Sequence, residues 1–367
     1  MGLVGFLRAA LVATAILSAA GSFAHAKVAD CARSPAQIFA TTGNSVVEIF
    51  SIAINPFLVS DRIIPRGGSG YVMEDGYVIT NYHVVADAKT VVVTYDGTGV
   101  EAEVVGIDPT LDIAVLRPYF MAPDAKAIRM AGDADIMIGQ TAYTIGFPLG
   151  LGKTISTGIV SGYGRVLPIT TSSWLSPFVQ TDAAISPGSS GGALVDSCGR
   201  LIGMITMGVD PGRGENVGFA IPVSVLRPVI DELIRTGKVA RPWHGLYGQF
   251  VTPPILLMLG IPAEAWEENT GFLVETVEPG SAADRVGLRG GSWPVNWGGT
   301  QILLGGEIIT HVNDIRIDSL ETALNVVRSL KIGDMVHLVG VREAGRFEVS
   351  VTLEERPLLR EELELYR

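Results

Sequence analysis

Residues 180–192 read Gln180-Thr-Asp-Ala-Ala-Ile-Ser-Pro-Gly-Ser-Ser-Gly-Gly192, and this glycine-rich segment is the most informative stretch of the chain. Gly188 stands two positions before Ser190, and two more glycines follow it. Glycines allow a sharp backbone turn and a close approach by a substrate carbonyl. Such a turn exposes the Ser190 hydroxyl and can point the N–H groups of Gly188 and Ser190 at one spot, as an oxyanion requires. The segment therefore makes Ser190 a candidate nucleophile.

A candidate base and a candidate acid stand upstream of this serine. His83 lies in Tyr77-Val-Ile-Thr-Asn-Tyr-His-Val-Val85, where a β-rich run ends near the imidazole. Asp112 lies in Asp108-Pro-Thr-Leu-Asp-Ile-Ala-Val-Leu116, where a loop turns into an apolar run. A serine hydroxyl needs a base to take its proton, and a carboxylate behind the imidazole fixes the tautomer. The chain order His, Asp, Ser is that of the chymotrypsin-type arrangement and excludes the α/β-hydrolase order.

The composition limits the other classes of function. The chain has 367 residues, which is enough for two or three domains, and only 18% of them are charged. Plentiful glycine and β-branched residues favour an all-β enzyme over a helical one. A formal net charge of −11 disfavours nucleic-acid binding. No cluster of residues has metal-ligand spacing and no glycine-rich stretch has a phosphate-loop lysine, so we expect no metal and no cofactor.

The first 26 residues have the pattern of a targeting segment. Arg8 precedes the apolar run 9–20, and Ala24-His-Ala26 is a small-x-small cleavage site. We interpret this segment as a secretory signal peptide cut after Ala26, which predicts export to the periplasm. The alternative is a retained membrane anchor, although the apolar run is short for a span of about 20 residues.

Two cysteines, Cys31 and Cys198, remain in the exported chain. They could pair in an oxidising compartment, or they could stay as two free thiols. The sequence alone leaves both possibilities open because it does not place their Cα atoms.

Short β-rich runs separated by Gly, Pro and Asp turns fill residues 44–225 and predict barrels or a sandwich. Helical spacing of apolar residues predicts a helix over 222–236, with Pro228 as a possible kink. A second helix is predicted over 318–330, with Glu321 completing a capping box with Asp318. The β-rich runs are Val46–Ile54, Val91–Tyr95, Ile113–Leu116, Thr141–Ile145, Ala193–Val195 and Leu201–Thr206.

Several motifs together resemble the HtrA (DegP-like) family of serine proteases. Ser189 replaces the family's usual Asn before the nucleophile, and Leu111 replaces its usual Thr before the acid. The resemblance implies an all-β protease domain of two chymotrypsin-like six-stranded β-barrels, with the triad in the cleft between them, followed by an α+β PDZ domain. The matching stretches are Gly68-Ser-Gly-Tyr-Val72, Thr80-Asn-Tyr-His-Val-Val85, Leu111-Asp-Ile-Ala-Val-Leu116, Gln180 to Leu194 and Gly218-Phe-Ala-Ile-Pro222.

Residues 243–356 resemble a PDZ domain of the HtrA type, through Trp243-His-Gly-Leu246 and Gly271-Phe-Leu-Val274 among other stretches. A PDZ domain binds an extended peptide at a sheet edge and captures its terminal carboxylate with backbone N–H groups, here expected at His244, Gly245 and Leu246. The segment 290–304 is expected to be a surface loop, with a lid as the alternative. The implied division is signal peptide 1–26, protease domain 27–225, helical linker 226–242, PDZ domain 243–356 and C-terminal tail 357–367.

The resemblance also assigns roles to single residues. Ser190 is the nucleophile, His83 the base and Asp112 the acid that orients it. The oxyanion hole is expected at Gly188, Ser189 and Ser190. No acidic side chain stands where a protease specific for basic residues would carry one, so cleavage after small or medium aliphatic residues is expected. The expected specificity pocket consists of Ile185, Met207, Val209 and Phe219.

The function that these observations favour is an ATP-independent periplasmic serine endopeptidase for protein quality control. It would cleave unfolded or exported proteins and bind peptide C-termini, as a homotrimer or a multiple of trimers, without nucleic acid. One alternative is a chaperone or peptide sensor with a restrained protease. Another is a signalling protease that cuts one membrane-protein partner.

Overall fold

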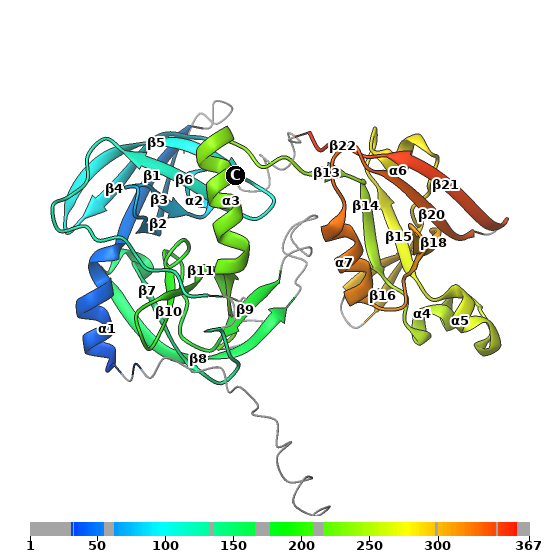
Figure 1. Cartoon of the computed structure of the whole chain (residues 1–367), viewed down its shortest axis with the longest axis horizontal. Coiled ribbons are helices and arrows are strands. Elements are labelled where there is room, and N and C mark those ends of the chain that lie inside the picture. The colour runs from blue at the N-terminus through cyan, green and yellow to red at the C-terminus, as the bar shows by residue number, and fades with distance from the viewer. Residues whose placement is uncertain are drawn as a thin grey trace, which may run out of the picture.

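The computed structural model describes residues 31, 33–54, 62–132, 135–165, 177–208, 216–297, 300–342 and 344–357. Figure 1 shows two β-rich bodies joined by the segment that follows a single long helix. The predicted signal peptide and residues 358–367 of the predicted tail lie outside the described residues. Within the described part of the chain, no helix is both long and apolar enough to cross a bilayer.

The first barrel is closed, with its strands in the order β1-β2-β3-β6-β5-β4. β1 pairs with β2 in an antiparallel register that runs from Val46 opposite Tyr71 to Ile54 opposite Ile63. Side chains that alternate along a strand fill the barrel interior. The strands are β1 (Val46–Ile54), β2 (Ile63–Val72), β3 (Val78–Thr80), β4 (Ala88–Tyr95), β5 (Thr98–Asp108) and β6 (Ile113–Pro118).

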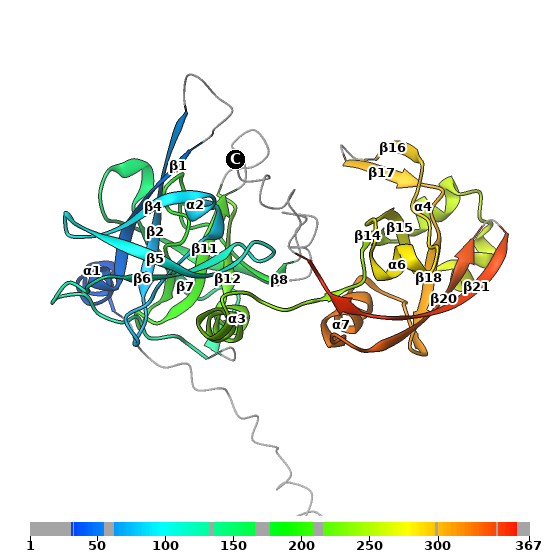
Figure 2. The same cartoon turned by 90° about the horizontal axis from the view of Figure 1, so that it is seen from above.

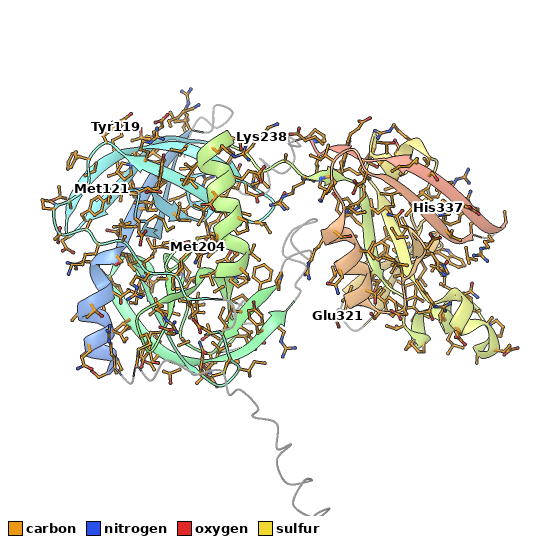
Figure 3. The ribbon with its side chains drawn as sticks, in the orientation of Figure 1. Tyr119, Met121, Met204, Lys238, Glu321 and His337 are labelled. Atoms are coloured by element: carbon orange, nitrogen blue, oxygen red, sulfur yellow. A yellow bond between two sulfur atoms is a disulfide. The ribbon has the colours of Figure 1, made fainter. Side chains whose placement is uncertain are left out.

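The second barrel is also closed, with its strands in the order β10-β11-β12-β9-β8-β7. Met204, labelled in Figure 3, is fully buried in its core together with Leu194 and Ile205. Two six-stranded barrels confirm the fold class expected of the first domain. The strands are β7 (Thr141–Gly146), β8 (Thr154–Arg165), β9 (Phe178–Thr181), β10 (Ala193–Asp196), β11 (Leu201–Gly208) and β12 (Gly218–Pro222).

Helix α3 (Val223–Thr236) follows the last strand of the second barrel. It is the helix that the apolar spacing predicted. Its buried face includes Leu226 and Leu233, and Pro228 lies inside the helix without ending it. Gly237 ends the helix in the left-handed conformation, with a φ of 77°. Gly106 of β5 lets the helix approach closely, because a Cβ there would lie 2.7 Å from the carbonyl oxygen of Leu233.

The C-terminal body is a sheet in the order β14-β15-β18-β20-β21, with β19 paired to β18. Strands β13 and β22 pair with each other, so the two ends of the body meet. The strands are β13 (Pro242–Trp243), β14 (Leu246–Phe250), β15 (Phe272–Val277), β16 (Trp293–Trp297), β17 (Thr300–Leu304), β18 (Ile308–Val312), β19 (Ile315–Arg316), β20 (Met335–Arg342), β21 (Gly345–Thr352) and β22 (Glu354–Glu355). Its helices are α4 (Pro253–Met258), α5 (Trp266–Asn269), α6 (Ala282–Arg285) and α7 (Leu320–Ser329).

Two expectations for the C-terminal body are wrong in detail. The cap of α7 is Ser319, whose hydroxyl accepts from Thr322 N, so the predicted box of Asp318 with Glu321 does not form. Serine and aspartate are comparable N-caps, and here the second of two adjacent candidates is used. Most of the segment 290–304 is not the expected loop: Trp293–Trp297 and Thr300–Leu304 pair as the β16–β17 hairpin, seen at one end of the body in Figure 2. Ile302 and Leu304 of this hairpin are buried, so it contributes to a small core with α4.

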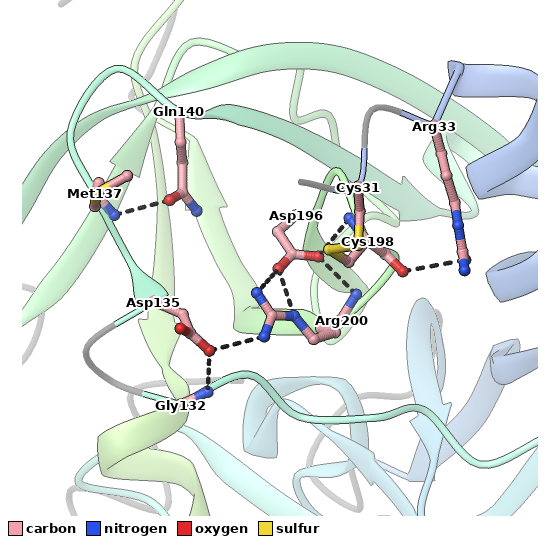
Figure 4. A network of polar contacts seen from close by, with 9 residues as sticks. All are labelled: Cys31, Arg33, Gly132, Asp135, Met137, Gln140, Asp196, Cys198 and Arg200. Carbon is pink, nitrogen blue, oxygen red and sulfur yellow. Dashed lines mark hydrogen bonds and ion pairs between the residues drawn. A yellow bond between two sulfur atoms is a disulfide. The ribbon is translucent and has the colours of Figure 1, made fainter. Parts of the chain in front are cut away.

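Cys31 and Cys198 form a disulfide across 167 positions of sequence, which answers the question that the sequence left open. Figure 4 shows the polar network around it. Arg200 forms ion pairs with Asp196 at 2.7 Å and with Asp135 at 2.8 Å, and Arg33 donates to the carbonyl of Cys198 at 3.2 Å. The bond fixes the segment before α1 (Pro35–Thr42) to the β10–β11 turn of the second barrel.

We predict that removing this disulfide destabilises the protease body. Closing so long a loop restricts the unfolded chain, and native disulfides typically contribute about 2–4 kcal/mol. In calorimetry of residues 27–367, Cys31→Ser, Cys198→Ser and the double variant should all unfold at the same, lower temperature. The reduced wild-type protein should match them. Equal melting of the oxidised protein and the double variant would show that the bond adds no stability.

Candidate active site

The structure brings the three predicted site residues to the junction of the two barrels. His83 lies in α2 (Tyr82–Val85), a single helical turn that follows β3. Asp112 stands directly before β6, and Ser190 lies in the loop between β9 and β10. The first barrel thus supplies the imidazole and the carboxylate, and the second supplies the hydroxyl.

Asp112 holds His83 through two contacts. Its Oδ2 lies 2.8 Å from the imidazole Nδ1, and its Oδ1 accepts from the backbone N–H of His83 at 2.9 Å. Asn81 donates its side-chain amide to the carbonyl of Asp112 at 2.8 Å, where the backbone has a φ of 57°. Because an ionised carboxylate only accepts, this contact places the imidazole proton on Nδ1 and leaves Nε2 as the basic nitrogen.

Asp108 forms the turn before Asp112. Its Oδ1 accepts from Thr110 N at 3.1 Å and from Leu111 N at 3.3 Å. Its other oxygen forms an ion pair with Arg241, in the segment that leads to the C-terminal body. The buried carboxylate therefore fixes the loop that carries Asp112.

Thr206 of β11 is a site residue that the sequence reasoning missed. Its hydroxyl donates to Oδ2 of Asp112 at 3.0 Å, and its carbonyl accepts from the Ser190 hydroxyl at 3.2 Å. It therefore touches both the acid and the candidate nucleophile. No motif marks this threonine, because it reads as one more residue of an apolar β-run.

The environment of His83 shifts its pKa in opposite directions. Burial lowers the pKa, the charge and hydrogen bond of Asp112 raise it, and the charge of Arg66 lowers it slightly. The result is a pKa above the ordinary histidine value. Asp112 therefore makes the imidazole more basic and stabilises its protonated form.

Hydrogen bonds fix the backbone of the nucleophile loop on nearly every side. The carbonyl of Pro187 accepts from Leu149 N at 2.7 Å, and that of Ser189 accepts from Gly192 N at 2.9 Å. Among the hydrogen bonds of the described residues, none uses the N–H of Gly188 or of Ser190. Since N–H and C=O of a trans peptide point in opposite directions, the bond at Pro187 turns the Gly188 N–H away from Leu149. The loop thus keeps two donors free for an oxyanion.

Ser189 does not belong to this pair of donors, contrary to the expected oxyanion set. Its N–H donates to the carbonyl of Ser186 at 2.9 Å, and its hydroxyl lies 3.5 Å from Ser186 N. The side chain is also buried. The Ser189 N–H is therefore engaged within the loop itself.

The expected specificity pocket is described only in part. Val209 lies outside the described residues, and Met207 is placed by its backbone in β11, opposite Phe219 of β12. Phe219 is buried in the barrel core and meets Phe178 edge to face, with ring centroids 6.4 Å apart. Ile185 is half-buried and lies against Gly218, where a Cβ would come within 2.4 Å of its Cδ1.

His244, Gly245 and Leu246, the residues expected to bind a peptide, lie at the start of the C-terminal body, where β13 leads into β14. An apolar pocket between the sheet and α7 is lined by His244, Leu246, Phe272, Ile309, Val327 and Leu338, among others. Gly245 has a φ of 72°, and a Cβ there would lie 2.0 Å from Cβ of Ser281, so only glycine fits. Among the described residues, no three His, Cys, Asp or Glu side chains gather as a metal site would require.

Comparisons with known proteins relate the chain to serine proteases. The trypsin-like peptidase domain family matches residues 68–204. The chain is 35% identical to Protease Do-like 1, chloroplastic, of Arabidopsis thaliana, over 88% of this chain and 72% of that protein. It is 34% identical to a probable periplasmic serine endoprotease DegP-like of Brucella suis biovar 1, over 81% of this chain and 54% of that protein. The chain thus spans about half the length of the bacterial relatives it matches.

Solved structures show the same likeness. The HtrA-type protease AlgW, solved with a decapeptide, matches with a TM-score of 0.69 and 28% identity, over 89% of this chain and 100% of that one. A serine endoprotease from Yersinia pestis matches with a TM-score of 0.63 and 28% identity, over 88% of this chain and 98% of that one.

We predict that Asp112→Asn lowers the pKa of His83, because the substitution removes the negative charge that raises it. An NMR titration of the imidazole should show protonation at lower pH than in the wild-type protein. Asp96→Asn, which removes an exposed carboxylate paired with Lys153, should leave the titration of His83 unchanged. An unchanged or higher pKa in Asp112→Asn would contradict the assigned contact.

Proposed function

This chain belongs to the HtrA (DegP-like) family of serine proteases and is a serine endopeptidase, and we propose that His83, Asp112 and Ser190 are its catalytic triad. The observation that carries the proposal is the chain of contacts through which Thr206 binds both Asp112 and Ser190, while Asp112 binds His83. These bonds join side chains from both barrels into one constellation.

In the proposed reaction, Ser190 Oγ attacks the carbonyl carbon of the scissile peptide bond. His83 Nε2 takes the hydroxyl proton and then gives it to the leaving amine, which departs as the bond breaks. The N–H groups of Gly188 and Ser190 donate to the oxyanion of each tetrahedral intermediate. Water, activated by the same imidazole, then hydrolyses the acyl-enzyme. Asp112 keeps the imidazole oriented and stabilises its cation throughout.

The proposed role is ATP-independent cleavage of unfolded or exported proteins in the periplasm, after removal of residues 1–26. The names of the bacterial relatives support the compartment and the reaction. The hydrogen bonds of the nucleophile loop favour a competent protease over a chaperone or sensor with a restrained one. The exposed side of Ile185 supports cleavage after small or medium aliphatic residues. We also propose that the chain assembles as a homotrimer or a multiple of trimers, on the family resemblance alone.

We further propose that residues 243–356 form a PDZ domain that binds peptide C-termini. β14 stands at the edge of its sheet, where a peptide can add as one more strand beside α7. The apolar pocket at this edge suits an aliphatic or aromatic terminal side chain. The related protease AlgW was solved with a decapeptide and with a tripeptide.

We predict that purified residues 27–367 degrade casein and that Ser190→Ala abolishes the activity, because no other group replaces the nucleophile. Ser189→Ala is the matched control: its hydroxyl is buried against Ser186, so substantial activity should remain. Degradation should be followed by gel, with cleavage sites read by mass spectrometry. Cleavage mainly after Lys or Arg would refute the expected pocket. Intact casein bound by the wild-type protein would favour the chaperone or sensor.

A further inference from the structure

Ser69 of β2 lies in the first barrel but binds the nucleophile loop of the second. Its hydroxyl donates to the carbonyl of Gly188 at 2.7 Å and accepts from Phe147 N at 2.9 Å. Its backbone N–H donates to the carbonyl of Ser190 at 2.8 Å. Its own carbonyl accepts from the Thr80 hydroxyl at 2.7 Å, so the residue is itself held in place.

These bonds lie next to both proposed oxyanion donors. The carbonyl of Gly188 belongs to the residue whose N–H is one donor, and the carbonyl of Ser190 to the residue whose N–H is the other. Gly188 has a φ of 92° and no side chain that packs. The hydrogen bonds around it therefore hold its peptide groups in this orientation. Ser69 is fully buried, and no water can replace its hydroxyl without a rearrangement of the loop.

We propose that Ser69 is a positioning residue for the oxyanion hole: from the opposite barrel it fixes the carbonyls of Gly188 and Ser190, the two residues whose N–H groups are the proposed donors. The inference rests on the oxyanion role proposed above for those two residues. It predicts that the hydroxyl stabilises the transition state and leaves substrate binding unaffected, because Ser69 contacts the loop and not the substrate pocket.

The test compares wild-type protein with Ser69→Ala, using a peptide p-nitroanilide ending in Val and the matching peptide boronate. The boronate forms a tetrahedral adduct whose oxygen occupies the oxyanion position. We expect kcat to fall about 10- to 100-fold, KM to stay within about twofold, and boronate affinity to weaken by the same factor as kcat. Ser69→Cys, with its weaker donor, should fall between the two and serves if the alanine variant does not fold.

Thr310→Val is the matched control. It removes another buried hydroxyl that donates to a carbonyl, that of Val339, but in the C-terminal body. Its kcat should stay at the wild-type value. If folded Ser69→Ala keeps the wild-type kcat and boronate affinity, the role of Ser69 is overturned. The same holds if the substitution changes only KM. Failure of the wild-type protein to bind the boronate would instead refute the proposed oxyanion site.

A second observation concerns the peptide site. The imidazole Nδ1 of His244 accepts the N–H of Leu246 at 3.0 Å. That N–H is one of the three expected to capture a peptide carboxylate. Nδ1 can accept only in the neutral imidazole, because a protonated ring carries a hydrogen on both nitrogens. The neutral imidazole of His244 therefore already binds one of the N–H groups that are expected to bind the peptide carboxylate.

The groups around His244 keep it neutral in the free protein. Burial and, to a lesser extent, the nearby charge of Arg356 together lower its pKa to about 4. The cleft beside it, of about 550 Å³, is also lined by Arg241, Arg328, Tyr247 and Glu278. Glu278 accepts from Trp243 at 2.5 Å and from Tyr247 at 3.0 Å, so its charge is already engaged.

We infer that His244 couples carboxylate binding to proton uptake, and this inference rests on the proposed capture of peptide C-termini. One proton from solvent converts Nδ1 from acceptor to donor, which frees the Leu246 N–H. The terminal carboxylate then accepts from both groups. Because the bound anion favours the imidazolium, peptide affinity rises as pH falls.

The test uses residues 27–367 carrying Ser190→Ala and three fluorescent decapeptides ending in Val, Leu or Phe. Anisotropy titrations between pH 8.0 and 5.5 should show affinity increasing about three- to tenfold, and calorimetry in two buffers should show proton uptake. His244→Asn is the control, because its amide oxygen can hold the Leu246 N–H but cannot titrate; its affinity should not change with pH. Peptides with amidated C-termini should not bind.

Affinity independent of pH, without proton uptake, would overturn the role of His244. A different result is that the protein with Ser190 intact degrades casein while no peptide with a free carboxylate binds. That result would refute the proposed capture of peptide C-termini, and the inference about His244 with it.

Discussion

The hydrogen bonds between the two barrels at the nucleophile loop are the constraint on which the rest of the site depends. Ser69 reaches from β2 to the carbonyls of Gly188 and Ser190, and Thr206 reaches from β11 to Asp112. Each barrel therefore carries a residue that completes the site of the other. A barrel folded alone would hold its own side chains but not the constellation.

Close backbone packing makes these bonds possible. A Cβ at Gly191 would lie 2.1 Å from the carbonyl oxygen of Ser69, and one at Gly188 would lie 2.5 Å from that of Phe147. Such distances exclude every residue except glycine without movement of backbone. The glycines that mark the loop in the sequence are therefore needed for the approach of the two barrels as well as for the turn.

The C-terminal body shows a similar dependence on short backbone contacts. The carbonyls of His244 and Gly245 accept from Ala283 N at 3.1 Å and from Glu278 N at 2.8 Å. These bonds fix the backbone of the loop that is expected to bind a peptide carboxylate. The Arg241–Asp108 ion pair then connects the entrance of this body to the loop that carries Asp112.

The sequence by itself determined the elements with a strong local signal. The apolar runs located three strands in each barrel (β1, β4 and β6; β7, β10 and β11), and helical spacing located α3. The glycines, with His83, Asp112 and Ser190 in that order, indicated the candidate site. Local signals did not distinguish Asp318 from Ser319 as the cap of α7, or a loop from a hairpin over 290–304.

Only the tertiary structure decided which groups meet. It paired Cys31 with Cys198, brought Thr206 and Ser69 to the candidate site, and engaged the N–H of Ser189, one of the expected oxyanion donors, within its own loop. The physical reason is that periodicity and turn chemistry act between residues a few positions apart. Hydrogen bonds across 94 or 119 positions depend on how the two barrels pack, and no local pattern records that packing.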